Sequence, residues 1–202
     1  MSTAATYPVM ERFPTLQGEG AWTGHPAWFI RLGGCDVGCS WCDVKESWPV
    51  EAHPQVTVET LVKEVVESGL PMVVVTGGEP CMHNLGALTT GLSDAGLSVH
   101  LETSGAHPVS GTWDWVTLSP KKFKACRPEW YLEADELKVV VVNDHDLTWA
   151  EEHAARLAPG ALKFLQPEWD RREKVMDRII QRIQRAPGWR LSLQTHKFIG
   201  LP

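Results

Sequence analysis

The stretch PAWFIRLGGCDVGCSWC, residues 26–42, joins a short apolar segment, a pair of glycines and three closely spaced cysteines. Residues 26–32 have the length and apolar character of a β-strand, and Gly33 and Gly34 end it. In α/β proteins, ligands bind in the loops that follow the strands. This stretch therefore predicts an α/β fold and places a candidate site directly after the strand.

The segments that follow alternate between short apolar runs and helical patterns. Thr57 is a suitable N-cap for a helix that Gly69 ends, and an apolar strand at residues 72–76 runs into Gly77 and Gly78. Further helices are expected at residues 84–95, 148–157 and 170–186, and further strands at residues 97–102, 113–118, 137–142, 162–165 and 189–193. This alternation predicts a mainly parallel sheet.

Length and composition limit the possible architectures. The 202 residues are 43% apolar and 22% charged, which is typical of a globular protein, and no linker divides them, so we expect a single domain over residues 1–202. A complete eight-fold βα barrel needs about 250 residues. Any barrel formed by this chain is therefore an abbreviated one.

Charge and hydropathy exclude other classes of protein. The net charge of −6 offers no basic surface for nucleic acid. The apolar runs are far shorter than the roughly 20 residues that a membrane-spanning helix needs. The first twelve residues do not have the pattern of a secretory signal, and we expect a cytoplasmic protein.

The chain has five cysteines, and Cys35, Cys39 and Cys42 form a CxxxCxxC motif. An odd number of cysteines disfavours a disulfide scaffold. Three thiolates do not complete a tetrahedral zinc site, but they suit an iron–sulfur cluster with one iron left open for a small-molecule ligand. On spacing alone, structural zinc with Cys81 or a distant histidine as fourth ligand remains an alternative. Cys81 and Cys126 have no assigned role, and a buried free thiol is the default expectation for both.

The cysteine motif, together with Thr76-Gly77-Gly78-Glu79-Pro80 about forty residues later, resembles the radical S-adenosylmethionine (SAM) superfamily. Its flanking motifs narrow the resemblance to the 7-carboxy-7-deazaguanine synthase family. The matching segments are Thr15 to Gly20, Phe29 to Cys35, Cys42-Asp43, Glu102 to Gly105, Ser119 to Lys121, Leu165 to Pro167 and Leu193 to Lys197. The resemblance covers nearly the whole chain and implies a partial βα barrel of the radical SAM type.

The resemblance also implies a reaction. The open iron of a [4Fe-4S] cluster holds SAM, whose reductive cleavage gives a 5′-deoxyadenosyl radical. That radical takes hydrogen from 6-carboxy-5,6,7,8-tetrahydropterin, the ring contracts with loss of ammonia, and SAM is regenerated. The product, 7-carboxy-7-deazaguanine, leads to queuosine and other 7-deazapurines.

Site residues follow from the same resemblance, position by position. Cys35, Cys39 and Cys42 would hold the cluster. The SAM site would comprise Trp41, Cys42, Asp43, Gly78, Ser119, Pro120, Lys121, Gln166 and Pro167, while Glu168 and Trp169 match the family less well. The substrate site would comprise Leu16, Gln17, Gly18, Arg31, Thr76, His196 and Pro202, with the guanidinium of Arg31 paired to the substrate carboxylate and the terminal carboxylate of Pro202 as a further contact.

One residue departs from the family pattern. The family depends on Mg²⁺, and Val44 stands where a threonine or serine usually supplies an oxygen ligand, which valine cannot do. Mg²⁺ is therefore expected as a cofactor, with its protein ligand unknown. The resemblance further implies a flavodoxin or ferredoxin as electron donor and a homodimer. Two alternatives remain: another small radical SAM enzyme, such as a glycyl-radical activase, and a zinc-binding module without enzymatic activity.

Overall fold

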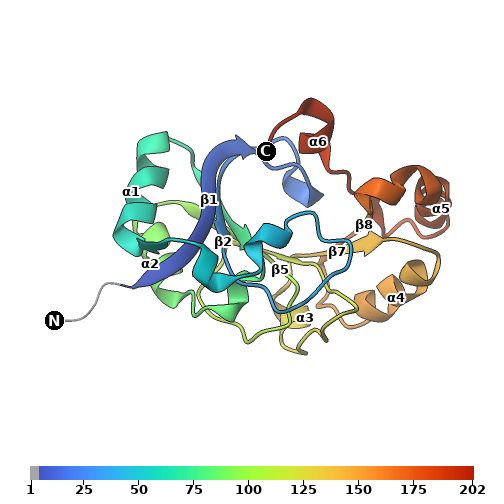
Figure 1. The fold of residues 1–202 in the computed structure, drawn as a ribbon. Coiled ribbons are helices and arrows are strands. Elements are labelled where there is room, and N and C mark those ends of the chain that lie inside the picture. The colour runs from blue at the N-terminus through green and yellow to red at the C-terminus, as the bar shows by residue number, and fades with distance from the viewer. Residues whose placement is uncertain (1–4) are drawn as a thin grey trace.

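The computed structural model describes residues 5–202, and in this part of the chain nine strands form one curved sheet with helices packed on its outer side (Figure 1). The order of the strands is β3-β1-β2-β4-β5-β6-β7-β8-β9. Their bounds are β1 Thr6–Leu16, β2 Pro26–Leu32, β3 Gln55–Thr57, β4 Met72–Gly77, β5 Ser98–Thr103, β6 Trp115–Leu118, β7 Glu136–Val141, β8 Leu162–Pro167 and β9 Arg190–Leu191. The neighbouring strands along β2-β4-β5-β6-β7-β8-β9 all pair in parallel.

The sheet does not close on itself within residues 5–202, because its two end strands, β3 and β9, do not pair with each other. This open arrangement confirms the prediction of an abbreviated barrel with a mainly parallel sheet. The exception to the parallel pairing is β1, which lies antiparallel to both β2 and β3. The carboxyl ends of the parallel strands therefore meet at one rim.

The sequence analysis missed strand β1, which carries prolines at positions 8 and 14. Strand β3 pairs only with Thr6–Pro8, so the rest of β1 has β2 on one side and no strand on the other. Pro14 lies in this edge segment, where its missing N–H costs no ladder hydrogen bond. A bulge between Val9 and Glu11 further interrupts the alternation expected of a strand.

The helices are α1 Val58–Ser68, α2 Gly86–Asp94, α3 Trp130–Glu133, α4 His145–Ala154, α5 Arg172–Arg185 and α6 Thr195–Ile199. The Thr57 hydroxyl caps α1 by accepting from the N–H of Thr60, and Gly69 ends the helix with φ 70°, as predicted. Leu61 and Val65 are fully buried against the sheet, whereas Val66 is half exposed. The short helices α3 and α6 were not expected.

The largest apolar core lies between the sheet and the helices that cover its outer side. It includes fully buried leucines from β2, α1, α2, β5, β6 and β7, with Trp130 of α3 closing its lower end. The predicted strand at residues 189–193 is reduced to Arg190–Leu191. Among the helices of residues 5–202, none is long and apolar enough to cross a membrane.

Candidate active site

A cavity of about 560 Å³ opens at the carboxyl ends of the parallel strands. This volume lies within the range of small-molecule and cofactor sites. Most of the residues predicted for the site line the cavity: Leu16, Gln17, Gly18, Arg31, Cys35, Cys39, Trp41, Cys42, Asp43, Thr76, Gly78, Ser119, Lys121, Gln166, His196 and Pro202. Pro120 and Pro167 are buried and are not among the residues that line it.

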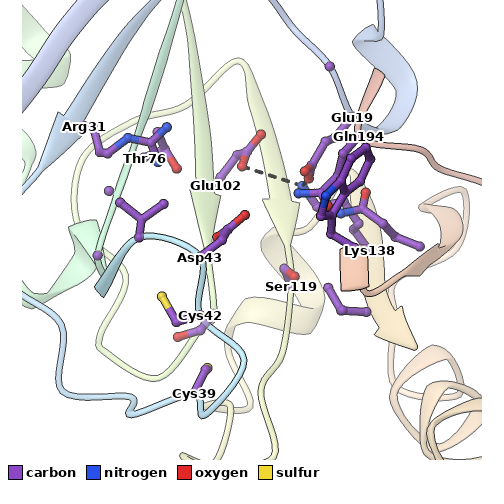
Figure 2. Close-up of a pocket in the computed structure, with 18 of the residues that line it drawn as sticks. Glu19, Arg31, Cys39, Cys42, Asp43, Thr76, Glu102, Ser119, Lys138 and Gln194 are labelled. Carbon is purple, nitrogen blue, oxygen red and sulfur yellow. Dashed lines mark hydrogen bonds and ion pairs between the residues drawn. The ribbon is translucent and has the colours of Figure 1, made fainter. Parts of the chain in front are cut away.

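The cysteine loop follows β2 and forms one wall of the cavity (Figure 2). Its backbone is fixed at both ends, because Cys35 N–H donates to the Trp48 carbonyl (3.1 Å) and Cys42 N–H donates to the Cys39 carbonyl (3.1 Å). The three thiols are free and pack against a small apolar cluster that includes Val37. Burial raises the pKa of Cys39 to about 11 and also raises that of Cys35.

These cysteines fit an iron–sulfur cluster by the chemistry of their donors. Thiolates are the protein ligands of such clusters, and coordination supplies the positive charge that removes their protons. Across residues 5–202 no three His, Cys, Asp or Glu side chains are grouped closely enough to hold a metal ion, so the fit rests on three free thiols facing one cavity. Cys81 and Cys126 do not line this cavity.

The turn after β4 lies directly beside the cysteine loop. A Cβ on Gly78 would come within 2.4 Å of the Gly34 carbonyl oxygen and 2.8 Å of Cys35 Cβ, so only glycine fits there. Glu79, which follows, is buried, and its carboxylate accepts hydrogen bonds from Cys81 N–H (3.1 Å), the Thr103 hydroxyl (2.6 Å) and both the N–H (2.8 Å) and the hydroxyl of Ser104. Glu79 therefore joins the ends of β4 and β5, and it lines the cavity together with Gly77 and Gly78.

Arg31 reaches the cavity from β2, on the side that Thr76 also occupies (Figure 2). Its Nε donates to Glu11 Oε1 at 2.5 Å, and Glu11 lies on the neighbouring strand β1. This ion pair fixes the guanidinium while leaving its two terminal nitrogens free of the Glu11 contact. The arrangement suits a bidentate interaction with a ligand carboxylate.

Lys121, Trp41 and Ser119 form a contact group near the cysteine loop. Lys121 Nζ donates to the Ser119 carbonyl (2.6 Å) and lies 5.8 Å from the centroid of the Trp41 ring. Burial lowers the pKa of Lys121. On the other side of the loop, Lys197 of α6 donates to Asp43 Oδ2 at 2.5 Å and lies 5.2 Å from the ring centroid of Trp169.

The loop after β1 and the C-terminal segment meet across the open side of the sheet. Both the N–H and the hydroxyl of Thr195 donate to the Gly18 carbonyl, at 2.9 and 3.0 Å. His196 packs so closely on Gly18 that a Cβ there would come within 2.0 Å of the ring. Burial lowers the pKa of His196, which favours its neutral form. Two segments from opposite ends of the chain thus form one wall.

Three charged residues that line the cavity have no role predicted from the sequence: Glu19 in the first loop, Glu102 in β5 and Lys138 in β7. Lys138 Nζ donates to Glu19 and lies 3.6 Å from Glu102 Oε2. The sequence contained one signal for this group, because Lys138 interrupts the apolar run of residues 137–142. Glu102 also belongs to one of the motifs that were matched to the family.

The radical SAM superfamily pattern matches residues 29–166 of the chain. A 7-carboxy-7-deazaguanine synthase from Synechocystis is 50% identical over 97% of this chain and 94% of its own length, and one from Flavobacterium psychrophilum is 49% identical over 96% and 92%. The chain belongs to the 7-carboxy-7-deazaguanine synthase family. The crystal structure of QueE from Escherichia coli matches with a TM-score of 0.84 at 36% identity, over 95% of both chains.

Membership of the 7-carboxy-7-deazaguanine synthase family confirms the resemblance seen in the motifs. As a radical SAM enzyme, the chain uses a [4Fe-4S] cluster and SAM, acts on a small-molecule substrate and needs a reductant. This assignment disfavours the zinc-binding module. The roles of individual residues stay predictions.

Proposed function

We propose that this enzyme converts 6-carboxy-5,6,7,8-tetrahydropterin to 7-carboxy-7-deazaguanine with loss of ammonia, in queuosine and 7-deazapurine biosynthesis. Identity of up to 50% to named synthases supports the reaction, and the observation that carries it is that the cysteine loop and Arg31 face one cavity. When bound, the cluster and SAM supply the radical that removes hydrogen from the substrate. The chain's own task is to hold both ligands in contact and to exclude water.

The cluster and SAM would occupy the wall formed by the loops after β2, β4 and β6. Cys35, Cys39 and Cys42 would hold the cluster. Gly78 packs closely on Gly34 and Cys35, which holds the turn after β4 beside the cysteine loop, where the polar end of SAM would lie. The remaining SAM contacts are proposed at Trp41, Asp43, Ser119, Pro120, Lys121, Gln166 and Pro167; of these, Pro120 and Pro167 could act only by shaping the turns behind the lining residues.

The substrate would lie between Arg31 and the wall formed by the first loop and the C-terminal segment. Arg31 would bind the carboxylate, and Thr76 lies on the same side. Leu16, Gln17, Gly18, His196 and Pro202 would contact the ring. The Gln17 amide is already used at both ends, because its oxygen accepts from Glu19 N–H (3.0 Å) and its nitrogen donates to Glu102 (2.9 Å). Gln17 therefore has one remaining N–H for the substrate.

Mg²⁺, which the resemblance implied, does not fit the side chains near Val44. Val44 lines the cavity but supplies no side-chain oxygen. The neighbouring Ser47 hydroxyl donates to the Val44 carbonyl (2.7 Å), and Asp43 is paired with Lys197. We infer that this enzyme depends on Mg²⁺ less than relatives that carry a hydroxyl at this position.

Further features of the protein stay predictions. They are a single domain over residues 1–202, a cytoplasmic location, a homodimer, and a flavodoxin or ferredoxin as electron donor. Limited proteolysis tests the first, sedimentation the third, and anaerobic reduction of the cluster by each candidate donor the last.

The deciding experiment incubates the anaerobically reconstituted protein with SAM, reductant and carboxytetrahydropterin. We expect 7-carboxy-7-deazaguanine and ammonia in equal amounts. A Cys39→Ala variant should form no product, whereas Cys126→Ser, altered outside the cavity, should retain activity.

Two results would contradict the proposal in different ways. If deoxyadenosine forms without the deazaguanine product, the proposed substrate is wrong but the assignment to the radical SAM superfamily stands. A glycyl-radical activase would then be the alternative to test. A colourless protein that binds zinc but neither iron nor sulfide would reject radical chemistry altogether.

A further inference from the structure

Lys138 is a buried lysine in the middle of a sheet strand. Its neighbours in β7, Leu137 and Val139, are fully buried in the core, while the Lys138 side chain points to the other face and lines the cavity with 4% of its surface exposed. An ammonium group removed from water in this way requires charged partners. Lys138 has two, Glu19 from the first loop and Glu102 from the end of β5.

These groups form a closed ring of interactions with Gln17. Lys138 Nζ donates to Glu19 Oε2, Glu19 N–H donates to Gln17 Oε1 (3.0 Å), and Gln17 Nε2 donates to Glu102 Oε1 (2.9 Å). The ring closes through the 3.6 Å ion pair between Glu102 Oε2 and Lys138. The other members of the ring thus set the orientation of each carboxylate, and Glu19 and Glu102 share Lys138 as their cation.

The charge balance of the ring depends on this single ammonium. Burial would raise the pKa of Glu19, but Lys138, with help from His196 and Gln166, lowers it to about 2. The other charged or titratable groups whose fields reach Lys138 are Glu102, Glu136 and Lys121. Without Lys138, two neighbouring buried carboxylates would repel each other, and one would retain a proton at neutral pH.

Glu102 keeps acceptor capacity toward the cavity. Each of its oxygens has one partner in the ring, and its side chain remains 21% exposed. Figure 2 shows Arg31 on one side of the cavity and the Glu19–Lys138 pair on the other, with Glu102 between them. Arg31 therefore offers a cation for a carboxylate at one end of the cavity, and Glu102 offers an anion for N–H donors between that end and the Glu19–Lys138 pair. A carboxypterin has the matching polarity, with its carboxylate at one end and the N–H groups of its aminopyrimidinone at the other.

We propose that Lys138 is a positioning residue whose ion pair with Glu102 holds that carboxylate in place to accept hydrogen bonds from the aminopyrimidinone N–H groups of the substrate. This inference rests on the proposed function, since it assumes a carboxypterin in the cavity. Lys138 acts through Glu102 and does not itself contact the substrate.

The test uses the reconstituted holoenzyme and measures binding of the product, 7-carboxy-7-deazaguanine, from pH 6 to 8.5 by equilibrium dialysis. In Lys138→Met the dissociation constant should rise by at least about 10-fold at pH 6.5, as expected when one partner of a buried charge pair is removed. It should recover as the pH rises through the elevated pKa of the carboxylate pair. The wild type should show no such acidic weakening.

The double variant Lys138→Met/Glu19→Gln separates positioning from a merely structural role. It removes one charge of each sign and takes the Glu19 carboxylate away from Glu102, so affinity should return to within about 3-fold of wild type with a flat pH profile. Lys174→Met, an exposed lysine on α5, is the matched control and should bind like wild type.

Two outcomes overturn the assignment of Lys138. They are a single variant whose affinity shows no new pH dependence, and a double variant that binds as weakly as the single one. If the wild type forms deazaguanine and the variants behave in either of these ways, only the positioning role of Lys138 is rejected. A wild type that neither binds nor forms deazaguanine would reject the proposed function, and this inference with it.

Discussion

A substitution at Val44 can test how strictly the reaction needs an oxygen ligand for Mg²⁺ at this position. Val44→Thr would place a hydroxyl beside Asp43 at the cavity wall. Because Mg²⁺ binds through oxygen, the variant should show a several-fold larger rate response to added Mg²⁺ than the wild type, whose rate should change little with Mg²⁺ or chelator. Initial rates over a Mg²⁺ titration measure this. An unchanged rate and an unchanged Mg²⁺ requirement would contradict it.

Glu79 belongs to the motif Thr76 to Pro80, and its hydrogen bonds indicate a structural role. Its buried carboxylate accepts four hydrogen bonds, so Glu79→Gln would turn an amide N–H₂ toward donors. We expect a loss of about 3 kcal/mol in the free energy of unfolding, or roughly 6–12 °C in Tm. The exposed Glu67→Gln on α1 should change stability by less than about 0.5 kcal/mol. Equal Tm values for the two variants would show that the Glu79 network is not stabilising.

Sequence motifs identified the residues whose type alone carries information, such as the three cysteines and Gly78. They gave no role to Glu19 or Lys138, although Glu19 lies in the motif Thr15 to Gly20, because a charged pair between the first loop and β7 depends on how distant segments fold together. For Lys138, the local signal was a lysine within the apolar run of residues 137–142. Pair partners of this kind have no fixed spacing in the sequence, so a single chain does not reveal them.

At the scale of elements, prediction was best where periodicity and caps agreed. Helix α1 begins after Thr57 and ends before Gly69 as expected. Helix α4 begins three residues earlier than predicted, at His145, because the Asp146 carboxylate accepts from the N–H groups of Val142 and Asn143 and so organises the turn before the helix. Strand β1 was missed because its two prolines are signals against a strand, and only pairing shows that they are tolerated.

Helices α3 and α4 are joined by a hydrogen-bonded group that should make stability depend on pH. Arg156 donates to the Tyr131 hydroxyl (3.0 Å), and the same hydroxyl is hydrogen-bonded to His153 Nδ1 (2.6 Å). Burial, with the charge of Arg156, lowers the pKa of His153 to about 4. Since the unfolded pKa is about 6.5, this group's stabilisation is complete above that pH and declines as the pH falls toward 4.

The size of this pH effect on stability can be measured by comparison with a variant that lacks the titrating imidazole of His153. Between pH 7.5 and 5 the wild type should lose about 2 kcal/mol more than His153→Gln, equivalent to roughly 4–8 °C in Tm. Thermal unfolding of both holoenzymes at the two pH values gives this difference, and carboxylates shared by both proteins cancel. Identical pH dependence would contradict a neutral buried His153.

At the scale of the molecule, the abbreviated barrel followed from chain length and family resemblance, and the structure explains how it is completed. The open sheet leaves a gap, and the first loop and the C-terminal segment cover it together through Thr195 and Gly18. Composition could not show this contact, because it joins residues 177 positions apart. The contact places the C-terminal segment at the site, although α6 has no residue buried in the core.

The C-terminal segment, residues 195–202, should matter more for substrate binding than for stability. Helix α6 has no buried residue, so deletion of residues 195–202 removes mainly exposed contacts and should lower the free energy of unfolding by less than about 2 kcal/mol. It also removes His196 and the cover over Gly18, so product affinity and kcat/KM should fall by at least about 100-fold, since a correctly placed substrate accounts for much of such a rate. SAM affinity should fall far less, because most of the proposed SAM contacts precede the deletion. Thermal unfolding, dialysis with each ligand and product formation measure the three effects.

A Tm decrease of more than about 10 °C, well beyond what 2 kcal/mol produces in a chain of this size, would instead make the C-terminal segment part of the structural core.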